Sequence, residues 1–314
     1  MIGALIAFAA ISTGAPSGPE VAFTARLYYP YPDNRVSKSQ VYICSFDGKG
    51  RRQLTTGSTE PAQIAWVSKQ KLCWTEVVGG KHRLVLYNLA SKRKSVLLSG
   101  SEAFSMVGTY DLFKPTSFPE YENDRARYRV TNDGLKRIEK AALPSFGGFG
   151  LDGQEWQIPG EPVIGFVSYR DDEATKSARF PHNDSIYIFE RAGRRYEWRL
   201  EGSFFQFFKA DTKGCAYLHV IDGGASAGTW EFLHEINWET GKLRRLVSGV
   251  HMLRLTKGSS RWTALEGGRQ LSKYGPEKMV WTKTAIVGDI AKGKRWSIAS
   301  GLVECYDIAL APGG

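Results

Sequence analysis

The densest cluster of acidic residues in the sequence is Asp171-Asp172-Glu173, which follows the apolar run from Ile164 to Arg170. Carboxylates at consecutive positions can coordinate calcium or serve as a general acid and a general base. A solvated loop is the simpler interpretation, because charged residues lie mostly at protein surfaces. With both interpretations open, we take as candidate ligand-binding residues Arg170, Asp171 and Asp172, and we assign them no catalytic role.

The five histidines do not form a metal-binding pattern. They never occur as H-x-H or H-x-x-x-H, the spacings that place two ligands on one face of a strand or helix. One run, Gly224 to Gly228 (GASAG), fits the letters of the G-x-S-x-G nucleophile motif, but it is expected to be a flexible connection and not the strand-to-helix turn that the motif requires. The sequence lacks a G-x-x-x-x-G-K-[ST] phosphate loop. We therefore expect no cofactor and no metal, and a binding protein is favoured over an enzyme. His182 is a candidate binding residue because it falls in a long loop.

The elements that must position these residues are short β-hairpins that recur along the chain. Each copy has an alternating strand, a tight turn rich in Asp, Gly, Ser or Lys, and a second strand that ends on an aliphatic residue. The steps are 45, 100, 47 and 53 residues between the equivalent positions Tyr42, Tyr87, Tyr187, His234 and Val287. The double step contains a further copy at Arg125 to Lys140.

A weaker strand pair precedes several of these hairpins, for example at Trp66 to Glu76 and at Phe208 to Val220. Two strands followed by a hairpin make a four-stranded unit, and such units repeated radially form propeller blades. The pattern predicts an all-β chain, a six-bladed β-propeller of four-stranded antiparallel blades, with seven blades as the alternative. Val303 to Leu310 is expected to pair with the first blade and close the ring.

Residues 19–314 are predicted to form this single propeller domain, and residues 1–18 a signal peptide or a disordered N-terminus. Residues 1–13 are apolar and too few to span a bilayer, which suits a secretory signal. No Lys or Arg precedes Arg26, so a buried first strand or a misplaced start codon stays open. No later segment could cross a membrane, and the chain is not expected to be an integral membrane protein.

The four cysteines, Cys44, Cys73, Cys215 and Cys305, are far apart and lie in apolar strand-like runs. An even number invites disulfide pairing in an exported protein. Their placement in separate blades favours buried free thiols instead.

Two motifs resemble the TolB-like (WD40-like) propeller family. Tyr42 to Gly48 followed by Gly50 to Thr55 is similar to its strand-turn-strand repeat, and Trp66 to Trp74 is similar to its W-S-P-D-G turn with Pro, Asp and Gly lost. We expect the chain to lack the additional N-terminal α/β domain that TolB has. The resemblance implies a bacterial, periplasmic or extracellular propeller that binds proteins or glycans, and it transfers no functional residues.

Basic residues gather at the turns of the hairpins. Eighteen of the 42 Lys and Arg lie there, and every hairpin contributes. A closed ring would display them as a peripheral basic annulus that attracts anionic polymers, lipid headgroups or an acidic partner. The simpler interpretation is that they provide solubility and discourage pairing between sheet edges. The principal candidates are Arg51, Arg52, Arg93, Arg194, Arg195, Arg244, Arg245 and Arg295.

The opposite face is expected to carry longer loops between the second and third strands of the blades. They include residues 29–39, 113–124, 171–184 and 267–278. Loops of this length in a compact domain usually have a function. The candidate residues for a ligand or partner on this face are Tyr31, Tyr121, Arg170, Asp171, Asp172, His182 and Tyr274.

The favoured function is a non-catalytic, exported propeller that acts as a protein-interaction scaffold in the bacterial cell envelope, with an envelope protein or glycan as partner. The alternative is a carbohydrate-active propeller, a polysaccharide lyase or glycoside hydrolase, with its site at the central channel. The net charge of +10 permits nucleic-acid binding, but no motif supports it.

Overall fold

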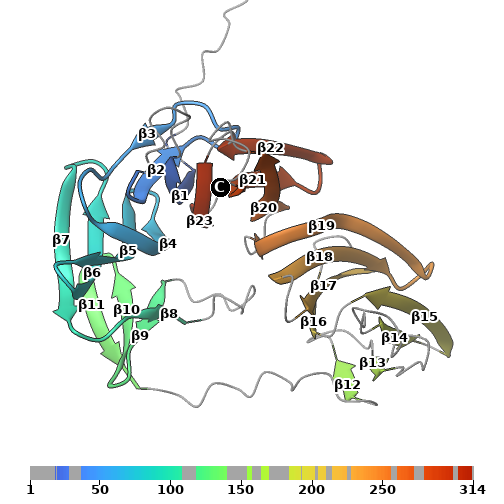
Figure 1. The fold of residues 1–314 in the computed structure, drawn as a ribbon. Coiled ribbons are helices and arrows are strands. Elements are labelled where there is room, and N and C mark those ends of the chain that lie inside the picture. The colour runs from blue at the N-terminus through green and yellow to red at the C-terminus, as the bar shows by residue number, and fades with distance from the viewer. Residues whose placement is uncertain are drawn as a thin grey trace, which may run out of the picture.

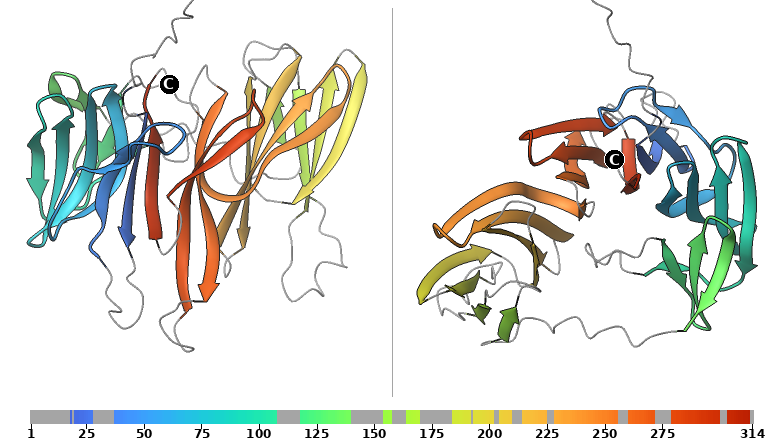
Figure 2. Two further views of the ribbon diagram at one scale, coloured as in Figure 1. Left: turned by 90° about the horizontal axis from the view of Figure 1, so that it is seen from above. Right: turned by 180° about the vertical axis from the view of Figure 1, so that it is seen from behind.

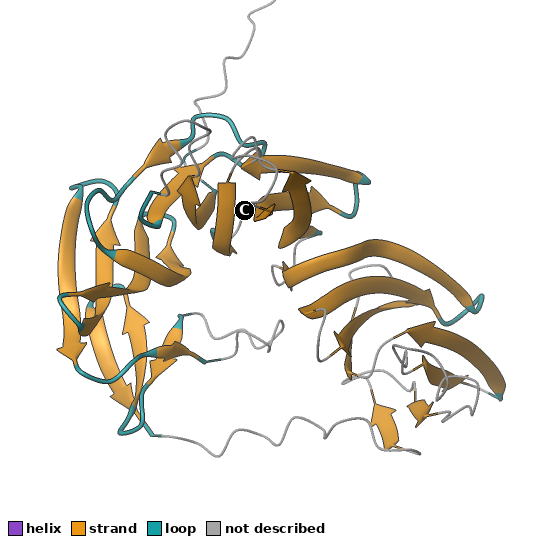
Figure 3. Cartoon of the chain, in the orientation of Figure 1, coloured by secondary structure: helices purple, strands orange, loops and turns teal. Residues whose placement is uncertain are grey.

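The computed structural model is built from β-strands (Figures 1 and 3). It describes residues 18, 20–27, 37–107, 118–139, 154–157, 164–169, 184–191, 193–201, 204–209, 214–224, 228–255, 260–271, 279–299 and 303–312. These parts of the chain contain twenty-three strands and no helix, and so no helix that could cross a membrane. The prediction of an all-β chain is confirmed.

Three sheets have four antiparallel strands each, paired in the order of the sequence. The first contains β4 (Glu60–Ser68), β5 (Lys71–Val78), β6 (Lys81–Asn88) and β7 (Arg93–Gly100). The second contains β8 (Ser105–Met106), β9 (Glu120–Glu122), β10 (Arg127–Thr131) and β11 (Gly134–Ile138). The third contains β12 (Gln154–Gln157), β13 (Ile164–Tyr169), β14 (Asp184–Arg191) and β15 (Arg194–Glu201).

The remaining strands form an eleven-stranded sheet in the order β16-β17-β18-β19-β20-β21-β23-β1-β2-β3, with β22 also paired to β21. From the N-terminal part come β1 (Val21–Leu27), β2 (Gln40–Cys44) and β3 (Arg52–Gln53). From the C-terminal part come β16 (Phe204–Lys209), β17 (Cys215–Gly224), β18 (Gly228–Asn237), β19 (Lys242–Leu255), β20 (Arg261–Leu271), β21 (Met279–Asp289), β22 (Lys294–Ala299) and β23 (Val303–Leu310).

All six hairpins predicted from the repeat are present. They are β2–β3, β6–β7, β10–β11, β14–β15, β18–β19 and β21–β22, each an antiparallel pair. The degenerate third copy turns at Asn132-Asp133-Gly134 as expected, and Gly134 has a φ of +129° that favours glycine.

The C-terminal strand β23 pairs with the N-terminal strand β1. The register runs antiparallel from Val21 opposite Leu310 to Leu27 opposite Val303. The predicted pairing of Val303 to Leu310 with the first hairpin group is confirmed and gives the strand order β23-β1-β2-β3, whereas closure of a ring stays a prediction.

One strand, β19, belongs to two groups of four strands. Its first half pairs with β18 and its second half with β20, and the pairing register shifts between His251 and Arg254. Gly249 and Met252 both have positive φ angles, +64° and +53°, at this bend. Such residues in a β-bulge turn the strand sharply, which lets β19 pass from one group into the next.

The sheets form an arc around a common centre in Figures 1 and 2. The arc runs from the β8–β11 sheet through β4–β7 and the group of β23 with β1–β3, then through β20–β22 and β16–β19 to the β12–β15 sheet. Figure 2 (left) shows β20 and β21 reaching beyond the neighbouring strands at one end. The described residues do not join the two ends of the arc, so the number of blades stays a prediction.

Five hydrophobic clusters lie between neighbouring groups of strands. Phe23, Phe46 and Ile298 share the cluster between the β23-β1-β2-β3 group and β20–β22. Ile43 and Trp74 share the next one, towards β4–β7. Similar clusters join β4–β7 to β8–β11, β16–β19 to β19–β22, and β15 to β16–β19. Groups that are neighbours along the arc therefore bury apolar faces against one another.

The four cysteines are free and buried, as predicted. Burial raises the pKa of the Cys44, Cys73 and Cys305 thiols to about 12, so these residues are packed apolar groups and not reactive thiolates.

Candidate functional site

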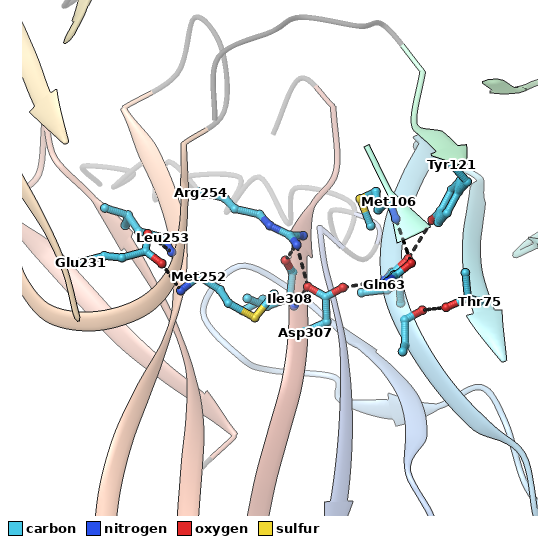
Figure 4. Close-up of polar contacts among 12 residues, drawn as sticks. Gln63, Thr75, Met106, Tyr121, Glu231, Met252, Leu253, Arg254, Asp307 and Ile308 are labelled. Atoms are coloured by element: carbon cyan, nitrogen blue, oxygen red, sulfur yellow. Dashed lines mark hydrogen bonds and ion pairs between the residues drawn. The ribbon is translucent and has the colours of Figure 1, made fainter. Parts of the chain in front are cut away.

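A set of buried and half-buried polar groups connects neighbouring groups of strands (Figure 4). We call Glu231, Arg254, Asp307, Gln63 and Tyr121, with their bonded partners, the polar network. The network connects strands from β18 to β9 through side chains that bind backbone groups of the neighbouring strand.

Asp307 on β23 is the centre of the network. Its carboxylate accepts hydrogen bonds from the N–H groups of Ile64 on β4 (2.7 Å) and Ile308 (2.8 Å). Its Oδ1 lies 2.9 Å from Nη2 of Arg254 on β19. The carboxylate therefore ties together three strands that belong to three different groups.

Burial raises the pKa of Asp307 above its ordinary value, and the Arg254 charge and the N–H donors oppose this effect. The residue is only 2% exposed, so the loss of hydration outweighs the attraction of its partners. Arg254 also donates from Nη1 to the carbonyl oxygen of Ile308 at 2.9 Å.

Glu231 on β18 holds the bend in β19. Its carboxylate accepts the N–H groups of Met252 (2.7 Å) and Leu253 (3.1 Å), and it lies 2.9 Å from Nε2 of the buried His219. Two adjacent N–H groups that point to one side make a concave site for an anion. The carboxylate of Glu231 fills that site from within the protein.

A similar bulge, also bound by a carboxylate, occurs on β4. Gln63 has a φ of +52°, nearly the value of Met252, and the register of β4 with β5 shifts between Ala62 and Ala65. The next N–H group, that of Ile64, binds the carboxylate of Asp307. A bulge with a left-handed residue followed by a carboxylate-bound N–H group thus appears in two separate strands.

Gln63 and Tyr121 extend the network to the β8–β11 sheet. The side-chain oxygen of Gln63 accepts the N–H of Met106 at 2.9 Å, and the Tyr121 hydroxyl donates to the backbone oxygen of Gln63 at 2.7 Å. Burial, and then the Cys73 thiol at 3.5 Å, raise the pKa of Tyr121 well above its ordinary value.

The position of Tyr121 corrects a prediction. We expected an exposed aromatic residue in a loop between the second and third strands of a blade. Residues Glu120–Glu122 instead form β9, the second strand of its sheet, and Tyr121 is fully buried. The tyrosine is a core residue whose hydroxyl is satisfied by a backbone carbonyl of the neighbouring sheet.

The other residues predicted for the loop face lie outside the described residues. They are Tyr31, Arg170, Asp171, Asp172, His182 and Tyr274. No group of three or more His, Cys, Asp or Glu side chains is arranged to hold a metal ion in the parts of the chain that the structure describes.

All eight arginines predicted for the basic annulus are exposed. They lie in or directly beside the last strand of their group: Arg51, Arg52, Arg93, Arg194, Arg195, Arg244, Arg245 and Arg295. One of them contacts the next hairpin, since Arg194 Nη1 on β15 donates to the carbonyl oxygen of Glu239 in the β18–β19 turn.

The sequence prediction missed the polar network itself. A signal was present in each case, because Asp307, Arg254 and Glu231 are charged residues with an apolar or aromatic residue on either side within a strand, as in YDI, LRL and WEF. A charge at such a position is rarely buried unless it is paired. The identity of its partner could not be inferred from the sequence, since Ile64 and Asp307 are 243 residues apart.

In chemical terms, the charged groups of the network are already bound to other groups of the same protein. The carboxylates of Asp307 and Glu231 accept backbone N–H groups, and each also has a cationic or imidazole neighbour. Such groups stabilise the contact between strands, and each oxygen of the two carboxylates already accepts a backbone N–H group.

Comparisons with known proteins identify no family. No family model matches the sequence, and no curated protein matches it. Solved structures that resemble it include TolB from Acinetobacter baumannii, at 13% identity and a TM-score of 0.46, over 93% of this chain and 67% of that one. A chain of the nidogen/laminin complex has 9% identity and a TM-score of 0.42, over 94% and 98%.

The β-propeller domain of the Trilobed protease from Pyrococcus furiosus also resembles the chain, at 12% identity and a TM-score of 0.33, over 91% of this chain and 83% of that one. Propeller proteins are thus among its structural neighbours. TM-scores below 0.5 give no basis for transferring a function, so the interpretation rests on the strands and contacts described above.

Proposed function

We propose that residues 19–314 form a six-bladed β-propeller that acts as a non-catalytic scaffold in the bacterial cell envelope. Six four-stranded groups can be drawn from the strand pairing when β19 contributes to two of them. The hydrophobic clusters between neighbouring groups support blades packed face to face around an axis.

The observation that carries the proposal of a scaffold is the engagement of the charged residues of the polar network. Asp307, Arg254 and Glu231 each bind strands of their own protein, which supports a structural role for these charges. A polysaccharide lyase or glycoside hydrolase would need at least two titratable groups directed at a substrate.

The partner is an envelope protein or a glycan, bound by the loops between the second and third strands of the blades. The residues proposed for this contact are Tyr31, Arg170, Asp171, Asp172, His182 and Tyr274. Aromatic rings and carboxylates together suit either a peptide or a sugar ring.

A capture experiment with matched variants tests this proposal. The tagged chain is expressed in a bacterial host, cross-linked and recovered from the envelope fraction as wild type, as Asp171→Ala/Asp172→Ala/Tyr274→Ala, and as the control Gln53→Ala/Ser95→Ala/Val96→Ala. The control residues are exposed on the opposite end of the strands.

We expect one partner to be recovered with wild type and control and lost with the loop variant. Recovery of the chain from the cytosol alone would contradict export. Equal recovery by all three proteins would contradict the loop face, and cleavage of a polysaccharide by the purified chain would favour the carbohydrate-active alternative.

A further inference from the structure

Two neighbouring hairpins, β2–β3 and β21–β22, pack together to form one surface. Phe46 in the first contacts Trp296 in the second edge to face, with ring centroids 5.4 Å apart. Gly48 lies against Ile298, where a Cβ atom would already be crowded. We call these two hairpins the basic double hairpin.

Six exposed basic side chains extend from the double hairpin. They are Lys49, Arg51, Arg52, Lys292, Lys294 and Arg295. Three of them pair with acids: Lys49 with Asp47 (2.9 Å), Lys292 with Asp289 (3.5 Å) and Arg295 with Glu266 (2.9 Å).

Arg51, Arg52 and Lys294 have no ion pair with any residue that the structure describes. Six positive charges therefore face three negative ones, and the three unpaired charges lie on adjacent turns. Lys49 is 86% exposed and Lys292 64% exposed, so these side chains project into solvent. The described side chains thus give the double hairpin an excess of positive charge.

The direction of the strands enlarges this surface. In a four-stranded antiparallel group, the turn after the third strand always lies at the same end as the turn after the first. The turns that carry Arg93, Arg194 and Arg244 occupy the equivalent position in their own groups. Basic side chains thus recur at the same end of the strands in several groups. A flat surface at that end could contact them simultaneously.

We propose that the basic double hairpin binds the surface of an anionic lipid bilayer. A flat, negatively charged surface can contact several exposed hairpin turns at once, and each Lys or Arg near it contributes about fivefold to the affinity. The contact needs no inserted apolar residue. It is independent of the loop face proposed above, which lies at the opposite end of the strands.

Vesicle co-sedimentation tests the proposal with the full chain. Vesicles contain phosphatidylcholine with 30% phosphatidylglycerol, or phosphatidylcholine alone. The test variant Arg51→Gln/Arg52→Gln/Lys294→Gln removes the three unpaired charges. The control Lys38→Gln/Lys81→Gln/Arg125→Gln removes three exposed charges from turns between second and third strands, so both variants have the same net charge.

We expect binding to the anionic vesicles only, weakening steeply with added salt. The test variant should lose roughly 100-fold in affinity and the control only a few-fold, given about fivefold per residue at the contact. Arg51→Lys/Arg52→Lys keeps the charge and should bind like wild type, which separates an effect of charge from an effect of folding. Thermal melting checks that each variant is folded.

Absence of binding to anionic vesicles at low salt would overturn the proposal. Equal losses in the test and control variants would also overturn it, because the net charge alone would then account for the attraction. Binding of a soluble polyanion such as heparin without any binding of vesicles would show that the partner is a polymer and not a bilayer.

Discussion

The centre and the rim of this molecule use charge in opposite ways. At the centre, Asp307 is 2% exposed and has partners on three strands. At the rim, Arg51, Arg52 and Lys294 are exposed and have no ion pair among the described residues. Central charges therefore fix the contacts between groups of strands, whereas rim charges are available to a partner.

The largest effect should follow from Asp307→Ala. The substitution leaves Arg254 without its counter-ion and the Ile64 N–H without its acceptor in a buried site. Loss of one member of such a pair typically costs about 3–5 kcal/mol. Urea unfolding followed by tryptophan fluorescence measures the change. Asp47→Ala, which removes an exposed carboxylate at the rim, is the control, and an equal shift in both variants would abolish the contrast.

The next effect depends on pH. Burial, with Arg245 contributing, lowers the pKa of His234 to about 4, whereas in the unfolded chain it titrates near 6.5. As the pH falls from 6.5 to 4, the unfolded chain gains a proton that the folded chain does not, so stability falls. The loss from this residue should reach about 2–3 kcal/mol at pH 4.

Unfolding free energies at pH 7 and pH 4.5 measure this slope. His234→Gln should lose less stability than wild type over that interval, because the variant has no imidazole to protonate. Parallel slopes for the two proteins would show that other groups are responsible. Arg245→Gln should have an intermediate slope, since only one of the two causes is removed.

A smaller effect is expected from Gly288→Ala on β21. The ring of Trp262 occupies the place where a Cβ atom would lie. Overpacking of this kind costs about 1–3 kcal/mol. Gly100→Ala on β7 is the matched control, because its nearest atom is 3.9 Å away. Similar melting temperatures for both variants would mean that β20 and β21 can separate without cost.

The smallest effect should come from the rim. Arg93→Gln and Lys242→Gln replace exposed side chains, and surface substitutions of this type usually change stability by less than about 0.5 kcal/mol. Thermal denaturation provides the measurement. A change as large as that of Gly288→Ala would show that rim charges also hold the fold together.

The sequence predicted best those elements that depend on residues close to one another in the chain. The hairpins could be predicted because their turns contain the residues that turns require, such as Asn132-Asp133-Gly134. The strand β9 was misinterpreted because it has only three residues and lies between Pro119 and Asn123, two residues typical of loops.

The polar network is different, because its partners are distant in the sequence. Gln63 meets Met106 across two sheets, and Asp307 meets Ile64 across almost the whole chain. No turn residue or periodic pattern in the sequence indicates such a contact between distant residues. Charged residues flanked by apolar ones within a strand are a sign that partners exist, and the three-dimensional arrangement shows which residues these partners are.

The pairing of β23 with β1 has a consequence for biosynthesis. A chain that emerges from its N-terminus must expose the edge of β1 until residues 303–310 have been made, because that edge is occupied only by β23. Unpaired edges of this kind invite association with other chains. The strand β1 is thus made early but has an unpaired edge until the end of synthesis. A chaperone would be most useful to this protein during that interval.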